Sequence, residues 1–257
     1  MDLLSLASSI LDSSQGQRLV ELSGERPTVF VGDTHGDREA TERVLARFDP
    51  VDHTIVFLGD AVDRGPDSRG NLALILTAIR EHPETVHLLM GNHEAWAVDP
   101  FRPADFWNGL PPEEERELSQ MLAQLPFVAH HPSNLLALHG ALPDVQALSE
   151  IEAIDLGSEA WRAITWGDWE TGGTGGLHVA GWRRPSFDRA AFEQRMITLG
   201  TRVLIRSHQP SAPRMLFDDR CLTLFSSCAY ADGVRRVALL PPDRPVETAR
   251  DLDLIEI

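Results

Sequence analysis

Short apolar runs alternate with helical patterns through the first half of the chain. Mostly apolar segments cover residues 28–32, 53–59 and 86–90, and runs of this length that end at or just before a glycine are typical of buried strands. Between them, residues 38–48 and 71–80 carry apolar side chains at helical spacing. Strand, helix and strand in this succession predict parallel strands joined by right-handed crossovers.

Strand-like runs dominate the second half of the chain, after a helix whose start is predicted by Pro111-Pro112 and the acid-rich segment Glu113–Glu117. The expected strands cover residues 135–139, 203–205, 214–217, 222–225 and 234–240. These patterns predict an α/β fold, a sandwich of two sheets with helices outside. We expect one domain over residues 1–257, in which residues 1–26 form a helical extension with amphipathic spacing at Leu3, Leu4, Leu6, Ile10 and Leu11.

The chain is strongly acidic, with 39 acidic residues against 23 basic ones and a formal net charge of −16. Nucleic acids and anionic membranes both favour basic surfaces, so we expect neither as a partner. Hydrophobic segments stay well short of the roughly 18 apolar residues that a membrane span needs. Because Asp2 stands where a secretory signal places basic residues, a cytoplasmic location is expected. Cys221 and Cys228 are too few for a disulfide framework and lack the spacing of a zinc site.

Polar residues with metal-binding chemistry follow the first three predicted strands. The loops read GDTHG (32–36), GDAVDRG (59–65) and GNHE (91–94), and two further histidines follow strand-like runs. Because ligand sites of open α/β sheets lie at the carboxyl ends of strands, these side chains are expected to converge. One loop alone also fits an ordinary turn, whereas five such segments in one chain predict a metal site. Its donors are Asp33, His35, Asp60, Asn92, His139 and His208, a mixed oxygen and nitrogen set that suits manganese, iron or zinc better than magnesium.

The motifs GDTHG, GDAVDRG, GNHE, HGAL and RSHQ stand in the order found in the phosphoprotein phosphatase (PPP) family of serine/threonine phosphatases. The chain resembles a compact, prokaryotic-type member of that family, within the calcineurin-like metallophosphoesterases, from residue 28 to residue 230. The resemblance implies a metallophosphoesterase-type β-sandwich of two mixed sheets flanked by helices. Two segments depart from the family pattern, because His139-Gly-Ala replaces His-Gly-Gly and Ser226-Ser-Cys-Ala-Tyr230 replaces Ser-Ala-Pro-Asn-Tyr.

The same resemblance implies two divalent metal ions per chain. Asp33 and His35 would hold the first ion and Asp60 would bridge both. The second would be held by Asn92, His139 and His208. Manganese is the expected metal in vitro, with iron and zinc as alternatives.

The resemblance also implies catalytic roles beside the metals. His93 would be the general acid that protonates the leaving group, and Asp63 would orient its imidazole. Arg64 and Arg183 would bind the phosphate together with Asn92, because a guanidinium fork matches two phosphate oxygens. Arg184 is a rival for the place of Arg183. Tyr230 matches a family tyrosine near the rim of the active site, although packing explains it nearly as well.

The expected function is metal-dependent hydrolysis of phosphate monoesters by direct attack of a metal-bridging hydroxide. A phosphoserine or phosphothreonine protein or peptide is the preferred substrate. A dinucleoside tetraphosphate hydrolase is the closest rival, because it shares the early metal loops. Small phosphomonoesters are a third substrate class, and a catalytically silent phosphate-binding module is the non-enzymatic hypothesis. The oligomeric state and the regulatory partners stay open.

Overall fold

Two β-sheets and the helices around them make up the computed structural model, which describes residues 2–14, 16–170, 184–230 and 233–257. Seven helices are seen in these parts of the chain: α1 (Leu3–Ser14), α2 (Arg38–Arg47), α3 (Ser68–Glu81), α4 (Asp105–Asn108), α5 (Pro112–Leu122), α6 (Glu159–Trp166) and α7 (Arg189–Thr198). Short 3₁₀ turns cover Glu94–Ala97, Leu148–Ala153 and Ala249–Asp251. None of the described helices is long and apolar enough to cross a membrane.

The five-stranded sheet carries the first half of the predicted pattern. Its order is β13 (Asp253–Glu256), β12 (Arg236–Leu240), β2 (Thr28–Val31), β3 (Thr54–Phe57) and β4 (Val86–Leu88). β2, β3 and β4 are parallel, as the spacing of strands and helices predicts, whereas β12 and β13 run antiparallel to their neighbours. α2 and α3 are the crossovers between the parallel strands, and each begins at an aspartate, Asp37 or Asp67, whose carboxylate accepts a backbone N–H of the first turn.

The six-stranded sheet is also mixed. Its order is β1 (Leu19–Glu21), β5 (Val128–His131), β6 (Leu135–Leu138), β9 (Val203–Arg206), β11 (Cys221–Thr223) and β10 (Met215–Leu216). A small parallel pair, β7 (Asp168–Trp169) and β8 (Ser186–Phe187), stands apart from both large sheets. Residues 19–21 fall within the expected N-terminal helical extension, but they form a strand, because β1 pairs with β5 at the edge of this sheet.

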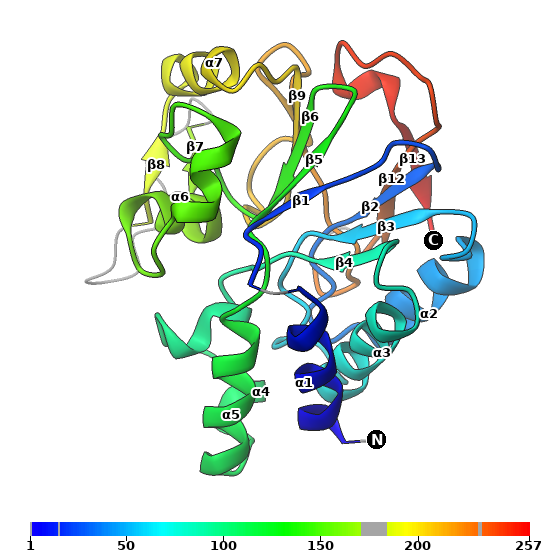
Figure 1. The fold of residues 1–257 in the computed structure, drawn as a ribbon, viewed down its shortest axis with the longest axis vertical. Coiled ribbons are helices and arrows are strands. Elements are labelled where there is room, and N and C mark those ends of the chain that lie inside the picture. Colours follow the sequence, from blue (N-terminus) through cyan, green and yellow to red (C-terminus); the bar gives the residue numbers. More distant parts are fainter. Residues whose placement is uncertain (1, 15, 171–183, 231–232) are drawn as a thin grey trace.

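Alternate side chains of the strands divide the core into two layers. Phe30, Val56 and Ala238 of the five-stranded sheet pack against residues of the six-stranded sheet, such as Ala137 and Ile205. Their neighbours on the same strands belong to the other core cluster, which includes apolar residues of α1, α2 and α3. Figure 1 shows these helices on the outer side of the five-stranded sheet, with α6 and α7 beside the six-stranded sheet. The predicted sandwich of two mixed sheets flanked by helices is therefore confirmed.

The burial of His131 at the end of β5 makes the stability of the protein sensitive to pH. Burial, together with the neighbouring His130, lowers the pKa of His131 to about 4, and its Nδ1 accepts the Ser133 N–H at 3.2 Å. Above pH 6.5 the ring is neutral in both the folded and the unfolded chain. As the pH falls from 6.5 towards 4, only the unfolded chain takes up the proton, so the free energy of unfolding decreases, by at most about 1.4 kcal/mol per pH unit for this one group.

We expect His131→Asn to make the pH dependence of stability shallower between pH 6.5 and 4.5, because asparagine keeps an acceptor for the Ser133 N–H but does not titrate. Urea unfolding of both proteins at several pH values in this range measures the difference. Parallel curves for the variant and the wild type would contradict a buried, neutral His131.

Candidate active site

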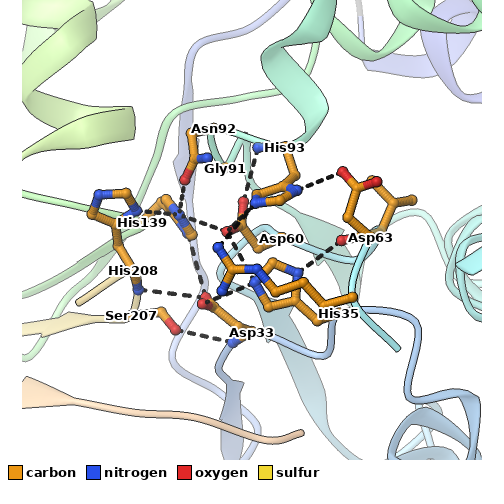
Figure 2. A network of polar contacts seen from close by, with 12 residues as sticks. Asp33, His35, Asp60, Asp63, Gly91, Asn92, His93, His139, Ser207 and His208 are labelled. Atoms are coloured by element: carbon orange, nitrogen blue, oxygen red, sulfur yellow. Dashed lines mark hydrogen bonds and ion pairs between the residues drawn. The ribbon is translucent and has the colours of Figure 1, made fainter. Parts of the chain in front are cut away.

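Loops at the carboxyl ends of five strands meet at one place in the molecule. They follow β2, β3 and β4 in one sheet and β6 and β9 in the other. Figure 2 shows the polar side chains of these loops pointing towards one another. All six predicted metal ligands lie here, and each is between 0% and 3% exposed: Asp33, His35, Asp60, Asn92, His139 and His208.

Asp60 lies at the centre of this cluster. Its Oδ2 is 3.4 Å from His35 Nε2, 3.4 Å from His139 Nε2 and 3.8 Å from His93 Nε2. Its other oxygen, Oδ1, accepts the His93 backbone N–H at 3.0 Å. One carboxylate therefore faces three imidazole rings that come from three different loops (Figure 2).

Asp33 and His139 link the remaining side chains to this centre. Asp33 lies 3.7 Å from His35 Nε2 through Oδ2 and 3.7 Å from His139 Nδ1 through Oδ1. His139 Nε2 is 3.2 Å from Asn92 Oδ1 and 3.1 Å from His208 Nδ1. The structure thus brings together all the donors that the sequence predicts.

The backbone of these loops adopts conformations that few residues tolerate. His35, Asp60 and His208 all have positive φ, at 42°, 54° and 68°, which costs a residue with a side chain on the order of 1–3 kcal/mol. Gly59 has a φ of 100°, and a Cβ there would lie 2.4 Å from the Gly91 nitrogen, so only glycine fits. Strain of this kind persists where the surrounding structure enforces it, as at a functional site.

Glu94, for which the motif alone gives no role, braces two of the loops. Its buried carboxylate accepts the backbone N–H groups of Asp60, Ala61 and Gly91 at 2.7, 2.8 and 3.0 Å. Burial, and then the charge of Asp60, raise the pKa of Glu94 to about 7. The loops after β3 and β4 are therefore held in register by one side chain.

Two buried imidazole nitrogens of the cluster are available as metal ligands. Among the described residues, His35 Nε2 and His208 Nε2 have no hydrogen-bond partner, and an unpaired buried polar atom is costly. Burial, and then the charge of Asp60, raise the pKa of Asp33. Burial opposes a charged His139, but the carboxylate of Asp60 outweighs it and raises the pKa of His139 to about 9. Two buried carboxylates that face each other thus call for nearby positive charge.

Divalent cations fit this donor set. Two groups of three side chains share Asp60, and within each group the candidate ligand atoms lie within 4.8 Å of one another; the groups are His35, Asp60 and His93, and Asp60, His139 and His208. Carboxylate oxygens and imidazole nitrogens in such sets are ligands for manganese, iron or zinc. His93, which the sequence predicts as an acid, is near enough to be counted with the first group.

His93 has partners on both sides of its ring. Nδ1 lies 2.6 Å from Asp63 Oδ2 and donates to it, while Nε2 lies 3.3 Å from Arg64 Nη2. Asp63 is fixed in turn, because its Oδ1 accepts the Phe106 N–H at 2.8 Å. Trp107 donates its indole N–H to the His93 carbonyl at 2.9 Å. The imidazole is therefore held in one orientation, with Nε2 facing the metal-ligand cluster and Arg64.

Of the two arginines that are candidates for the second phosphate-binding residue, the structure describes only Arg184. Arg183 lies outside the described residues. Arg184 Nη1 lies 3.7 Å from Asp168 Oδ2, and its guanidinium sits over the Trp166 ring at 5.6 Å. Asp168 in turn lies 3.8 Å from His208 Nε2 through Oδ1. Burial, and then the charge of Arg184, lower the pKa of His208.

Tyr230 also contacts the metal-ligand cluster. Its hydroxyl donates to Asp33 Oδ2 at 2.5 Å, and its ring centroid lies 5.9 Å from that of His35. The structure thus places Tyr230 at the site, whereas the sequence left packing as a nearly equal explanation. The sequence assigned no role to Asp168, whose position beside His208 depends on the packing of β7.

Comparison with known proteins identifies the family of this chain. The model of the calcineurin-like phosphoesterase family matches residues 26–212. Serine/threonine-protein phosphatase 6 catalytic subunit of Drosophila melanogaster is 26% identical over 83% of this chain and 74% of its own length. This relative is a serine/threonine phosphatase, as expected from the sequence motifs that resemble the PPP family.

Solved structures share the fold. A serine/threonine phosphatase from Saccharomyces cerevisiae, with similarity to human phosphatase PP5, has a TM-score of 0.76 at 21% identity, over 100% of this chain and 90% of its own. A chain described as a diadenosine tetraphosphatase has a TM-score of 0.50 at 17% identity, over 93% of this chain and 98% of its own. The family match covers all six residues of the ligand cluster, and the chain belongs to the calcineurin-like phosphoesterase family, whose members are metal-dependent hydrolases.

Proposed function

We propose that this metallophosphoesterase removes phosphate from phosphoserine and phosphothreonine in proteins or peptides. The observation that carries the proposal is the buried Asp63–His93 pair, 2.6 Å long, set beside the metal-ligand cluster with Arg64 next to it. An alkoxide is a poor leaving group and needs a proton, and this pair has the chemistry to supply one. The similarity to curated serine/threonine-protein phosphatases supports the same substrate class.

The metal-ligand cluster would hold two divalent cations. We assign Asp33 and His35 to the first, Asp60 to both, and Asn92, His139 and His208 to the second, with manganese as the expected ion and iron or zinc as alternatives. When bound, such ions lower the pKa of water and neutralise charge on phosphate oxygens. Their positive charge would also offset the repulsion between the buried carboxylates of Asp33 and Asp60. A bound ion would give the unpaired His35 Nε2 a partner.

The chain's own residues would bind the phosphoryl group and move the proton. Arg64 would bind phosphate oxygens through its guanidinium fork, with Asn92 beside it. Arg183 is the second arginine of the proposal and Arg184 its rival. His93 would donate a proton from Nε2 to the leaving oxygen, because Asp63 holds Nδ1–H and so aims Nε2 at the site. Asp63 acts on the orientation of the ring.

A dinucleoside tetraphosphate hydrolase is the alternative enzyme. We retain it because the fold resembles that of a chain described as a diadenosine tetraphosphatase. The motif sequences DRG (63–65) and RSHQ (206–209) favour the protein phosphatase. A catalytically silent binding module is the non-enzymatic hypothesis, although every expected ligand and His93 are present.

The substrate class is tested with manganese-loaded protein. We expect faster phosphate release from a phosphothreonine peptide than cleavage of diadenosine tetraphosphate, and loss of both activities in Asp60→Asn. Asp99→Asn, which changes a buried aspartate paired with Arg162 at 3.3 Å, is the matched control and should retain activity. Preferential cleavage of the dinucleotide would move the enzyme to the rival class. Bound metal without any turnover would favour the silent module.

The role of His93 predicts an effect that depends on the leaving group. We expect His93→Asn to lower kcat on a phosphothreonine peptide by about 10²–10⁴-fold, because the alkoxide then leaves without a proton donor. On p-nitrophenyl phosphate, whose phenolate leaves without protonation, the loss should be far smaller. Steady-state kinetics of both substrates measure the two losses, with His53→Asn, a half-buried histidine that contacts the Asp49 carbonyl, as the control. Equal losses on the two substrates would show that His93 is not the acid.

A further inference from the structure

Asp37 joins the first ligand loop to a distant part of the chain. It follows Asp33, His35 and Gly36 directly and begins α2 as the N-cap residue. Its carboxylate also accepts Arg235 Nε at 2.8 Å and Arg235 Nη2 at 3.0 Å, a bidentate pair. The Asp37 side chain is 3% exposed and that of Arg235 is 15% exposed. A two-point pair of this kind is stronger and more directional than the exposed i,i+4 pairs of α2, such as Arg43 with Glu39.

The same carboxylate holds the turn that carries Tyr230. Asp37 Oδ2 accepts the backbone N–H of Cys228 at 2.8 Å, two residues before the tyrosine. At the start of the turn, Ser226 donates its N–H to the Asp33 carbonyl at 3.1 Å, and its Oγ accepts the Gly32 N–H at 2.9 Å. The turn is thus bonded along its length to the loop that supplies Asp33 and His35.

Tyr230 stands at the end of this chain of contacts. Its hydroxyl donates to Asp33 Oδ2 at 2.5 Å and its ring lies against Phe225, with centroids 4.3 Å apart. A partner that hydrogen-bonds a metal-binding carboxylate fixes the orientation of that carboxylate and so tunes the site. The bond from the Cys228 N–H to Asp37 holds the backbone two residues before Tyr230 close to the first ligand loop.

We propose that the Asp37–Arg235 pair is a positioning device: it holds the Tyr230 turn against the first ligand loop, so that the Tyr230 hydroxyl orients the carboxylate of Asp33. The proposal rests on the proposed function only in taking Asp33 as a metal ligand. Neither Asp37 nor Arg235 contacts the reacting groups in this scheme. Both act through Tyr230, and Arg235 contributes by fixing Asp37 in the position where it accepts the Cys228 N–H.

Kinetics test the route through Tyr230. We expect Arg235→Gln to lower kcat on p-nitrophenyl phosphate by about 10-fold or more, with less than about a 2-fold change in KM, as for other residues that orient metal ligands. In a Tyr230→Phe background the same change should cost less than about 2-fold, because the hydroxyl that it positions is already gone. Additive losses, or a Tyr230→Phe enzyme with the kcat of the wild type, would overturn the proposal.

Tyr230 is the only tyrosine of the chain, so a second test needs no turnover. Protein labelled with 3-fluorotyrosine should give one ¹⁹F resonance from this position. In metal-free protein we expect Arg235→Gln to shift or broaden this resonance. Arg189→Gln, which removes an exposed pair with Glu193 in α7, should leave the resonance unchanged. An unchanged resonance in Arg235→Gln would overturn the positioning role. If the wild type released no phosphate, the proposed function would fail, while this spectrum would still decide the role of Arg235.

Discussion

The burial of Asp60 among three imidazole rings is the interaction on which the rest of the site depends. Its carboxylate oxygen lies 3.4–3.8 Å from nitrogens of His35, His139 and His93, and water reaches almost none of it. Burial alone would raise the pKa of Asp60, but His139 and then His93 outweigh it and lower the pKa well below its ordinary value. A carboxylate kept charged in the interior needs fixed positive partners, and a pair of divalent cations would supply them.

The fold can be understood as the scaffold that makes this burial possible. Both sheets contribute, since Asp60 follows β3 of one sheet and His139 follows β6 of the other. The apolar layer between the sheets fixes their separation, and Glu94 fixes the loops after β3 and β4 through three backbone N–H groups. The strained backbone at Asp60 and His35 is held by these contacts, so the free energy of packing the sandwich is what sustains the geometry of the site.

Much of this arrangement could be predicted from the sequence, because each ligand motif directly follows an apolar run and strand ends meet in an open sheet. The parallel order of β2, β3 and β4 and the convergence of the six donors followed from those patterns. β1 could not be predicted, since a three-residue edge strand has too little pattern and forms only by pairing with β5. The contact of Tyr230 with Asp33 joins residues 197 positions apart, and that of Asp168 with His208 depends on the packing of β7, so both required the tertiary structure.

Electron paramagnetic resonance of the manganese-loaded protein, measured beside its Asp60→Asn variant, tests the central claim most directly. If Asp60 is shared by two ions, the wild type should bind two Mn²⁺ per chain and show an exchange-coupled signal. The variant should lose that coupling, because the shared carboxylate is gone, and show isolated Mn²⁺ at lower occupancy. A wild type with only isolated Mn²⁺, or a variant that keeps the coupled signal, would contradict the bridging place of Asp60.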